Sequence, residues 1–162
     1  MKSEFMFSDQ EGMDLGTELF HLVSALTPII NVDLLIQRER LGIRETLLVW
    51  REDEFYRGWH LPGGVIRFKE SMLNRVELVG KEELGANFSV VRGPIHVSEK
   101  MNYSRNTRGH FISLLFECEL ENQPSQEHLQ LGSEVEKNGH WAWHEKVPDS
   151  FLTQQELYEK YI

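Results

Sequence analysis

The sequence contains a single cysteine, Cys118, so no disulfide bond can form within one chain. Chains without disulfides are typical of reducing compartments. No apolar run approaches the roughly 20 residues that cross a bilayer, and residues 1–8 lack the long apolar core of a signal peptide. These absences predict a cytoplasmic protein with no membrane partner. Cys118 ends an apolar run that begins at Phe111, which favours a buried, unreactive thiol.

Positive charge is also scarce, because 17 Lys and Arg residues face 26 Asp and Glu residues and the formal net charge is −9. Broad binding to nucleic acid needs basic surface that displaces counterions, so we expect no nucleic-acid partner. A small anionic ligand remains compatible with this charge. A few arginines and one divalent cation can hold such a ligand inside an acidic protein.

The sequence shows no internal repeat, low-complexity tract or linker, and this predicts one domain. We expect residues 1–12 to form a loosely held extension and residues 13–162 to form the domain. With 40% apolar and 27% charged residues, the chain has enough apolar material for a core.

Hydrophobic periodicity predicts interleaved helices and strands. A helix is predicted over 14–27, because an apolar stripe recurs at helical spacing and Pro28 ends it. The stripe consists of Leu15, Leu19, Leu22, Val23 and Leu26. Strands are predicted over 31–38, 45–51, 90–99, 110–120 and 141–143, with further helices over 70–84 and 150–161. Residues 40–42 are predicted to form the turn between the first two strands, and residues 65–68 can form an extended segment after the glycine pair. This alternation predicts the α/β class and a mixed sandwich, with Trp141 and Trp143 packed in its core.

The most informative stretch runs from Gly64 to Ala86, where a glycine-bearing turn leads into a helix that ends in Glu82, Glu83 and Gly85. Adjacent carboxylates usually lie in solvent. At the C-terminal end of a helix, however, they oppose the helix dipole, and this unfavourable placement indicates a functional reason. Mg²⁺ prefers such oxygen ligands and keeps several waters.

This stretch resembles the Nudix box, G-x5-E-x7-R-E-U-x-E-E-x-G-U, in which U is a bulky aliphatic residue. The matching positions are Gly64, Glu70, Glu82, Glu83 and Gly85, whereas Leu78, Val79 and Gly80 replace R-E-U, and Ala86 is small for the last U. The resemblance implies a Nudix-type α/β/α sandwich with a mixed sheet and Mg²⁺ as cofactor, or Mn²⁺ in its place. Val79 shares a helix face with Glu83, so one carboxylate of the box is missing and fewer metal ions are expected.

GDP-mannose mannosyl hydrolases also lack the R-E pair, and the sequence is similar to that family beyond the box. The similar segments are 18–20, 27–28, 32–33, 47–51 and 58–64. The resemblance implies hydrolysis of a nucleoside-diphosphate sugar of the GDP-mannose type, with release of GDP and free sugar. It also implies a homodimer paired through the N-terminal helix and first strand.

The same resemblance assigns roles to individual residues. The Gly63 carbonyl and Glu83 would bind Mg²⁺ directly, and Glu82 would contact a metal-bound water. Arg51 would lie on the diphosphate and stabilise the departing GDP, a role that needs a fixed positive charge. Asp33 would face the same cavity and contact the substrate.

Two departures from the family leave roles open. The family has an arginine after the glycine pair, where this chain has Val65; Arg67, two residues on, would point to the same side of an extended segment and contact the substrate. The family also has a metal-binding amide and a general-base histidine before the tryptophan strand. We expect Glu136 to supply both functions, with His140 as the alternative base. A polar loop between strands could reach a sugar or a phosphate, and it contains Tyr103, Arg105 and Arg108.

Two other functions remain open at this point. One is a Nudix pyrophosphatase that cleaves the P–O–P bond of another nucleoside diphosphate derivative. The other is a Nudix module that binds a nucleotide sugar without turning it over.

Overall fold

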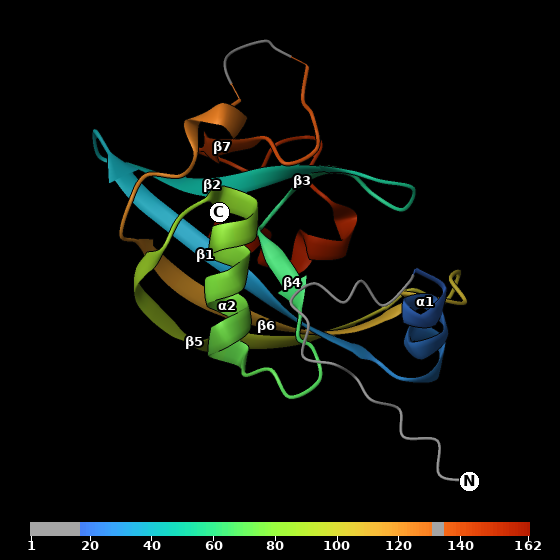
Figure 1. Ribbon diagram of the computed structural model, residues 1–162. Coiled ribbons are helices and arrows are strands. Elements are labelled where there is room, and N and C mark those ends of the chain that lie inside the picture. The colour runs from blue at the N-terminus through green and yellow to red at the C-terminus, as the bar shows by residue number, and fades with distance from the viewer. Residues whose placement is uncertain (1–16, 131–134) are drawn as a thin grey trace, which may run out of the picture.

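The computed structural model describes residues 17–130 and 135–162 (Figure 1). The expected extension over 1–12 and the first leucine of the N-terminal stripe, Leu15, lie outside these residues. The elements are α1 (Thr17–Leu26), β1 (Ile29–Arg40), β2 (Ile43–Glu52), β3 (Arg57–His60), β4 (Gly63–Val65), α2 (Met72–Val79), the π-helix η1 (Gly80–Leu84), β5 (Phe88–Met101), β6 (His110–Leu120), the 3₁₀ helix η2 (Gln126–His128), β7 (Trp141–His144) and the 3₁₀ helix η3 (Thr153–Tyr161).

The strands form one mixed sheet in the order β3-β2-β1-β6-β5, with β4 also paired to β1 and β7 to β2. β1 and β6 run parallel, and the remaining pairs are antiparallel. β1 is long enough to serve two groups of strands: residues 29–36 pair with β6, and residues 37–40 pair with β2. The predicted α/β class with a mixed sheet is confirmed.

Alternation along the strands divides the core into two layers, one on each face of the sheet. Val32, Leu34 and Ile36 of β1 belong to one cluster together with Val76 and Val79 of α2. Leu35 of β1, Leu48 of β2 and Tyr158 of η3 belong to the other cluster. The predicted helix–sheet–helix sandwich therefore consists of α2, the sheet and η3.

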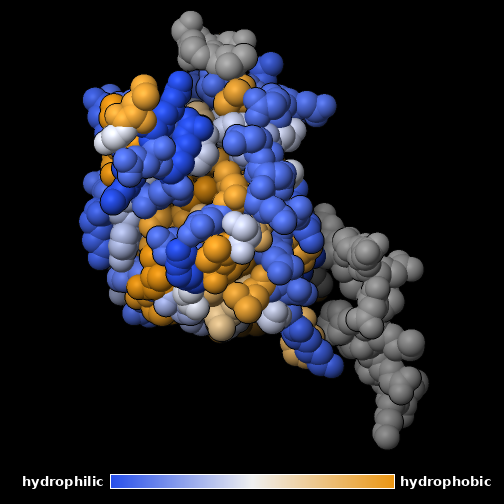
Figure 2. Space-filling view, turned by 90° about the vertical axis from the view of Figure 1, so that its left-hand side faces the viewer, coloured by the Kyte–Doolittle hydropathy of each residue, from blue (hydrophilic) through white to orange (hydrophobic). Residues whose placement is uncertain are grey.

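The layers are visible from two directions. Figure 1 shows α2 lying across the front of the sheet. Figure 2 views the molecule from the left of Figure 1 and shows apolar residues along the middle of that side, with hydrophilic residues on both flanks.

Turns occur where the sequence predicts them. Leu41 and Gly42, with φ of 53° and 79°, join β1 to β2 in the left-handed conformation of a two-residue hairpin. Gly85, with φ of 61°, ends η1, and its N–H donates to the backbone carbonyl oxygens of Gly80 and Lys81. Gly85 was predicted to be the helix stop, and this is confirmed.

The helix predicted over 70–84 has two parts. Ser71 caps its start by accepting a hydrogen bond from the Asn74 N–H at 3.1 Å, so α2 begins at Met72. The last five residues form η1, a wider π-helix of a kind that often marks functional sites. Gly80 begins it, and a Cβ there would approach the Phe88 ring to 2.5 Å. The extended segment expected over 65–68 is shorter, because β4 ends at Val65. The C-terminal helix expected over 150–161 is a 3₁₀ helix that begins at Thr153.

The N-terminal helix differs most from expectation in its packing. Its apolar stripe exists, but Leu22 and Leu26 are 57% and 78% exposed, and Leu19 and Val23 are each 44% exposed. The stripe therefore covers little of the core. Among the described residues, no helix is both long and apolar enough to cross a membrane.

Two predictions about the core are confirmed. Trp141 is 2% exposed and Trp143 packs beside it in the cluster under α2. Cys118 is 1% exposed in the same cluster, and burial raises the pKa of its thiol to about 12. Such a thiol is unreactive near neutral pH, because the thiolate is the reactive form.

Candidate active site

A pair of glycines allows β4 to lie between β1 and α2. A Cβ on Gly63 would stand 2.6 Å from Asp33 Oδ1 and 2.7 Å from the Val32 carbonyl oxygen. A Cβ on Gly64 would stand 2.8 Å from a methyl of Val79. Any side chain at either position would push the strand away from its neighbours, so the glycines fix the turn against both layers.

Glu83 lies on η1 and points toward this turn. Its Oε2 is buried and has no hydrogen-bond partner among the described residues. Burial raises the Glu83 pKa to about 8, while the Arg51 charge and a backbone hydrogen bond from Gly63 act in the opposite direction. The negative charge of Asp33 raises the pKa further. A buried carboxylate oxygen without a partner is costly, and a cation at this point would remove the cost.

The surroundings of Glu83 suit one hydrated divalent ion. The described residues contain no cluster of three or more His, Cys, Asp or Glu side chains around one point. Mg²⁺ needs only one or two carboxylates, because it keeps several waters. Val79 occupies the position of a further carboxylate in the box, and it is 1% exposed inside the core. Glu83 and the Gly63 backbone are thus the groups that could hold such an ion.

Arg51 lies near the end of β2, and two neighbouring side chains fix the orientation of its guanidinium. Its Nε donates to Asp53 Oδ2 at 2.7 Å, and its guanidinium stacks over the Tyr56 ring at 4.8 Å. Its charge lowers the pKa of both Glu83 and the buried His60, so it lies near both groups. Burial, and then Arg51, hold the His60 pKa at about 4, which leaves that ring neutral.

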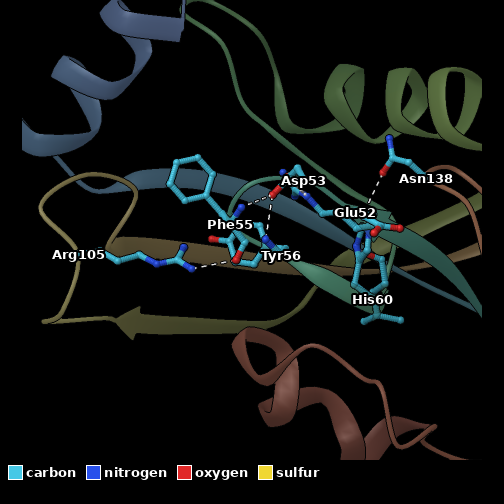
Figure 3. A network of polar contacts seen from close by, with 9 residues as sticks. Glu52, Asp53, Phe55, Tyr56, His60, Arg105 and Asn138 are labelled. Carbon is cyan, nitrogen blue, oxygen red and sulfur yellow. Dashed lines mark hydrogen bonds and ion pairs between the residues drawn. The ribbon is translucent and has the colours of Figure 1, made fainter.

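The loop between β2 and β3 brings the Tyr56 ring beside Arg51, and Figure 3 shows Asp53, Phe55 and Tyr56 of this loop. Asp53 Oδ1 accepts hydrogen bonds from the Phe55 and Tyr56 N–H groups, which closes the loop. Arg105, from the distant loop between β5 and β6, donates to the Phe55 carbonyl at 3.0 Å. The sequence did not predict this arrangement, because β3, β4, α2, η1 and β5 separate the two loops along the chain.

Asp33 is 3% exposed and lies deep in the sheet. It accepts hydrogen bonds from Tyr158 Oη at 2.8 Å, Asn31 Nδ2 at 2.9 Å and Gln155 Nε2 at 3.3 Å. Burial raises its pKa to about 6, and these hydrogen bonds oppose the rise. Asp33 is therefore close to Gly63 and Glu83 and is held by η3. Its expected contact with substrate stays a prediction.

A buried ion-pair network holds α2 over the turn. Arg75 is 5% exposed, and its guanidinium contacts Glu70 Oε1 at 2.9 Å and Glu82 Oε2 at 3.5 Å. Glu70 also accepts the Arg67 N–H at 2.8 Å, so this box residue has a structural role. Glu82 is 61% exposed in its side chain, and its role through a metal-bound water stays a prediction. Arg75 was missed, although an arginine one turn before the box arginine position was visible in the sequence.

The expected base residues lie in the loop before β7. His140 Nδ1 contacts Gln130 Oε1 and accepts the Lys137 N–H, and the His140 carbonyl accepts the Trp50 N–H. Glu136 is partly buried in the same loop. Within 17–130 and 135–162, no hydrogen bond or ion pair joins Glu136 or His140 to Glu83, so both base assignments stay predictions.

Two expected substrate contacts lie on the surface. Arg67 is exposed in the turn after β4, so the strand alternation used to orient it does not apply. Tyr103 is 91% exposed in the loop between β5 and β6, where its hydroxyl contacts Met101 Sδ at 3.2 Å. Neither role is tested by these positions.

Comparisons with known proteins support the fold. No family model matches the chain. The chain is 29% identical over 132 residues to the low-salt glycan biosynthesis protein Agl8 of Haloferax volcanii, covering 76% of this chain and 81% of that protein. A MutT Nudix hydrolase from Burkholderia pseudomallei superposes with a TM-score of 0.64 at 18% identity, over 84% of this chain and 98% of that chain. The Nudix domain of Shewanella oneidensis NrtR, complexed with ADP ribose, gives 0.54 at 21% identity, over 73% of each chain. The chain thus has the Nudix fold.

Proposed function

We propose that this chain is a Mg²⁺-dependent Nudix hydrolase that acts on a nucleoside-diphosphate sugar, with the GDP-mannose type as the first substrate class. The observation that carries the proposal is the unpartnered, buried Oε2 of Glu83 beside Gly63 and near Arg51. The Nudix fold and the five matching box positions support the reaction class. The relative named for glycan biosynthesis is consistent with a nucleotide-sugar substrate.

In this proposal Arg51 binds the diphosphate. Asp53 holds its Nε and the Tyr56 ring holds its plane, which leaves the two Nη groups to meet phosphate oxygens. Bound Mg²⁺ would add neutralisation of the diphosphate charge, and Mn²⁺ would serve as a substitute. Glu83 and the Gly63 carbonyl would hold the ion, and Glu82 would contact a metal-bound water. The substrate contacts Asp33, and its outer part contacts Arg67 and Tyr103.

The general base is Glu136 in this proposal, with His140 as the alternative. A carboxylate base gives a rise in activity with a midpoint near about pH 4–5, and a histidine base gives one near about pH 6–7. The pH profiles of Glu136→Gln and His140→Gln separate them, because only the true base variant loses the rise. If both variants keep the wild-type profile, neither residue is the base.

Paired variants test the metal assignment. Glu83→Gln is expected to lower Mg²⁺ affinity or rate by about tenfold to a hundredfold, because it removes an anionic ligand. Glu82→Gln is the matched control and should cost less. Mg²⁺ titrations of hydrolysis, together with Mn²⁺ binding followed by electron paramagnetic resonance, measure both. Equal activity of Glu83→Gln and wild type at low Mg²⁺ and saturating nucleotide would refute the assignment.

Product analysis in ¹⁸O-water separates the proposed reaction from the pyrophosphatase alternative. Attack at the anomeric carbon places the label in the free sugar and releases GDP, with inversion at that carbon. Attack at phosphorus places the label in a phosphate and makes the chain an ordinary Nudix pyrophosphatase. A chain that binds nucleotide sugars but yields no product with Mg²⁺ or Mn²⁺ is a binding module instead.

We also propose a homodimer paired through α1. The exposed leucines of its stripe support this, because a monomer would leave them in water. Light scattering at micromolar protein should give twice the monomer mass for wild type and the monomer mass for Leu22→Glu. Leu41→Glu, at a 93% exposed hairpin leucine, is the control and should leave the mass unchanged. We further expect the protein to act in the cytoplasm without a membrane or nucleic-acid partner.

A further inference from the structure

A cavity of about 210 Å³ opens beside Tyr56, between the β2–β3 loop and the β5–β6 loop. Three cationic side chains line it, namely Lys100, Arg105 and Arg108, and none of its lining residues is an Asp or Glu. Tyr103 and Phe111 add aromatic surface. In a chain with net charge −9, a cavity whose charged lining residues are all cations points to an anionic occupant.

Arg108 carries the strongest sign of a missing partner. Its Nε is buried and has no hydrogen-bond partner among the described residues. Burial lowers the Arg108 pKa, and the like charges of Arg51 and Arg105 lower it further, while Tyr56 and Asp53 act in the opposite direction. A buried guanidinium donor without an acceptor is costly. Arg108 also lines the cavity, where its guanidinium would meet an oxyanion.

A purely structural role for these arginines explains only part of the geometry. Arg105 stacks over Tyr56 at 4.9 Å, and Arg108 stacks over Phe55 at 4.8 Å. Stacking uses the faces of the guanidinium groups, whereas their N–H donors lie along the edges. The one hydrogen bond from Arg105 Nη2 to the Phe55 carbonyl leaves further edge donors. Stacking on the aromatic rings therefore fixes the planes of the two guanidinium groups and leaves N–H donors at their edges to bind an anion.

The cavity adjoins the proposed diphosphate site. Tyr56 lines the cavity, and the same ring carries Arg51 at 4.8 Å. In Figure 3 the loop of Phe55 and Tyr56 stands between Arg105 and the end of β2, where Glu52 and Asp53 lie. A group linked to a diphosphate on Arg51 would thus need to pass only one aromatic ring to reach Arg105.

We propose that this cavity is a subsite for an acidic group on the sugar, so that the substrate is a nucleoside-diphosphate sugar that carries a carboxylate, phosphate or sulfate. The cavity is smaller than the roughly 300 Å³ at which pockets for whole ligands begin, so it suits one part of a larger molecule. This inference rests on the proposed function for the position of the diphosphate. The cation-lined cavity itself does not depend on it.

Matched substrates test the subsite through turnover. UDP-glucuronate differs from UDP-glucose, and GDP-mannuronate from GDP-mannose, by a carboxylate in place of a hydroxymethyl group. We expect wild type to favour the acidic member of at least one pair by about tenfold to a hundredfold in kcat/KM, as a charge-assisted hydrogen bond allows. Arg105→Gln should lower this ratio to near one. Arg44→Gln, at an exposed arginine in the β1–β2 hairpin, removes the same charge and should leave the ratio unchanged.

A binding experiment separates failure of the subsite from failure of the proposed function. Inorganic phosphate, sulfate and acetate are titrated separately into ¹⁵N-labelled wild type, and the Nε–H resonances of Arg105 and Arg108 are followed. Saturable shifts of these resonances with any of the three anions, absent in Arg105→Gln, support the subsite even if no nucleotide sugar is hydrolysed. Unmoved Arg108 resonances with all three anions overturn it, as does equal turnover of acidic and neutral sugars by wild type.

Discussion

His60 is a neutral, buried histidine whose protonation should link stability to pH. It is 7% exposed at the end of β3, and its Nδ1–H donates to the Leu61 carbonyl at 2.6 Å. Burial and the nearby Arg51 lower its pKa from 6.5 to about 4, and Asp53 opposes this only in part. Below pH 6.5 the unfolded chain therefore takes up a proton that the folded chain refuses, and stability falls as pH falls.

The size of the effect follows from the two pKa values. With 6.5 unfolded and about 4 folded, the loss is about 2 kcal/mol at pH 5 and about 3 kcal/mol at pH 4. The loss begins near the unfolded pKa and levels off below the folded one. Carboxylates also titrate in this range, and the raised pKa of Asp33 acts in the opposite direction, so the wild-type curve alone does not isolate His60.

The variant His60→Gln isolates the contribution of His60 to the pH dependence of stability, because glutamine is neutral at all pH values and can donate to the same carbonyl. Urea midpoints are measured from about pH 7 to pH 5 and converted with the common slope. The stability of His60→Gln relative to wild type should rise by about 2 kcal/mol over that range. His128→Gln, at an exposed histidine, is the control and should follow wild type. Parallel curves for His60→Gln and wild type would refute the buried neutral state.

Three further predictions concern the site and core. Arg51→Lys should lower kcat more than it raises KM, because an ammonium cannot grip two phosphate oxygens; steady-state kinetics with an unchanged kcat would leave only a binding role. Gly63→Ala should cost about 1–3 kcal/mol of stability in urea unfolding, because its Cβ would meet Asp33 Oδ1 at 2.6 Å; wild-type stability would show that β4 can move. Cys118 should resist iodoacetamide in the native protein, and rapid alkylation seen by mass spectrometry would contradict its burial.

The parts of the site that the sequence predicted are those with short-range causes. Gly85 stops the helix through its left-handed conformation, and the carboxylate of Glu83 stands two residues before it. Both features depend on neighbours within one or two turns, so the box spacing was enough to place them. The same holds for the Leu41 and Gly42 hairpin.

The parts that were missed depend on contacts between distant segments. Asp33 meets Tyr158 across 125 positions, and no local pattern predicts that η3 would close over it. Arg105 reaches Phe55 across 50 positions through two loops. The apolar stripe on α1 was predicted from the helical spacing of its residues. That spacing does not determine whether the stripe packs against the rest of the chain or against a partner. The π-helix η1 was not predicted, because one extra residue in a single turn leaves no mark in the spacing of the apolar residues.

The ion pair between Arg75 and Glu70 shows how the box can vary without losing its architecture. Residues three apart on a helix share a face, so Arg75 reaches the side of α2 on which the box has its arginine, the position of Leu78 here. In this chain the cation beside Glu70 is Arg75, which stands one turn before that position. A pattern that demands arginine at a single position would therefore reject chains that keep the same charge in space. A search based on helix faces would accept them.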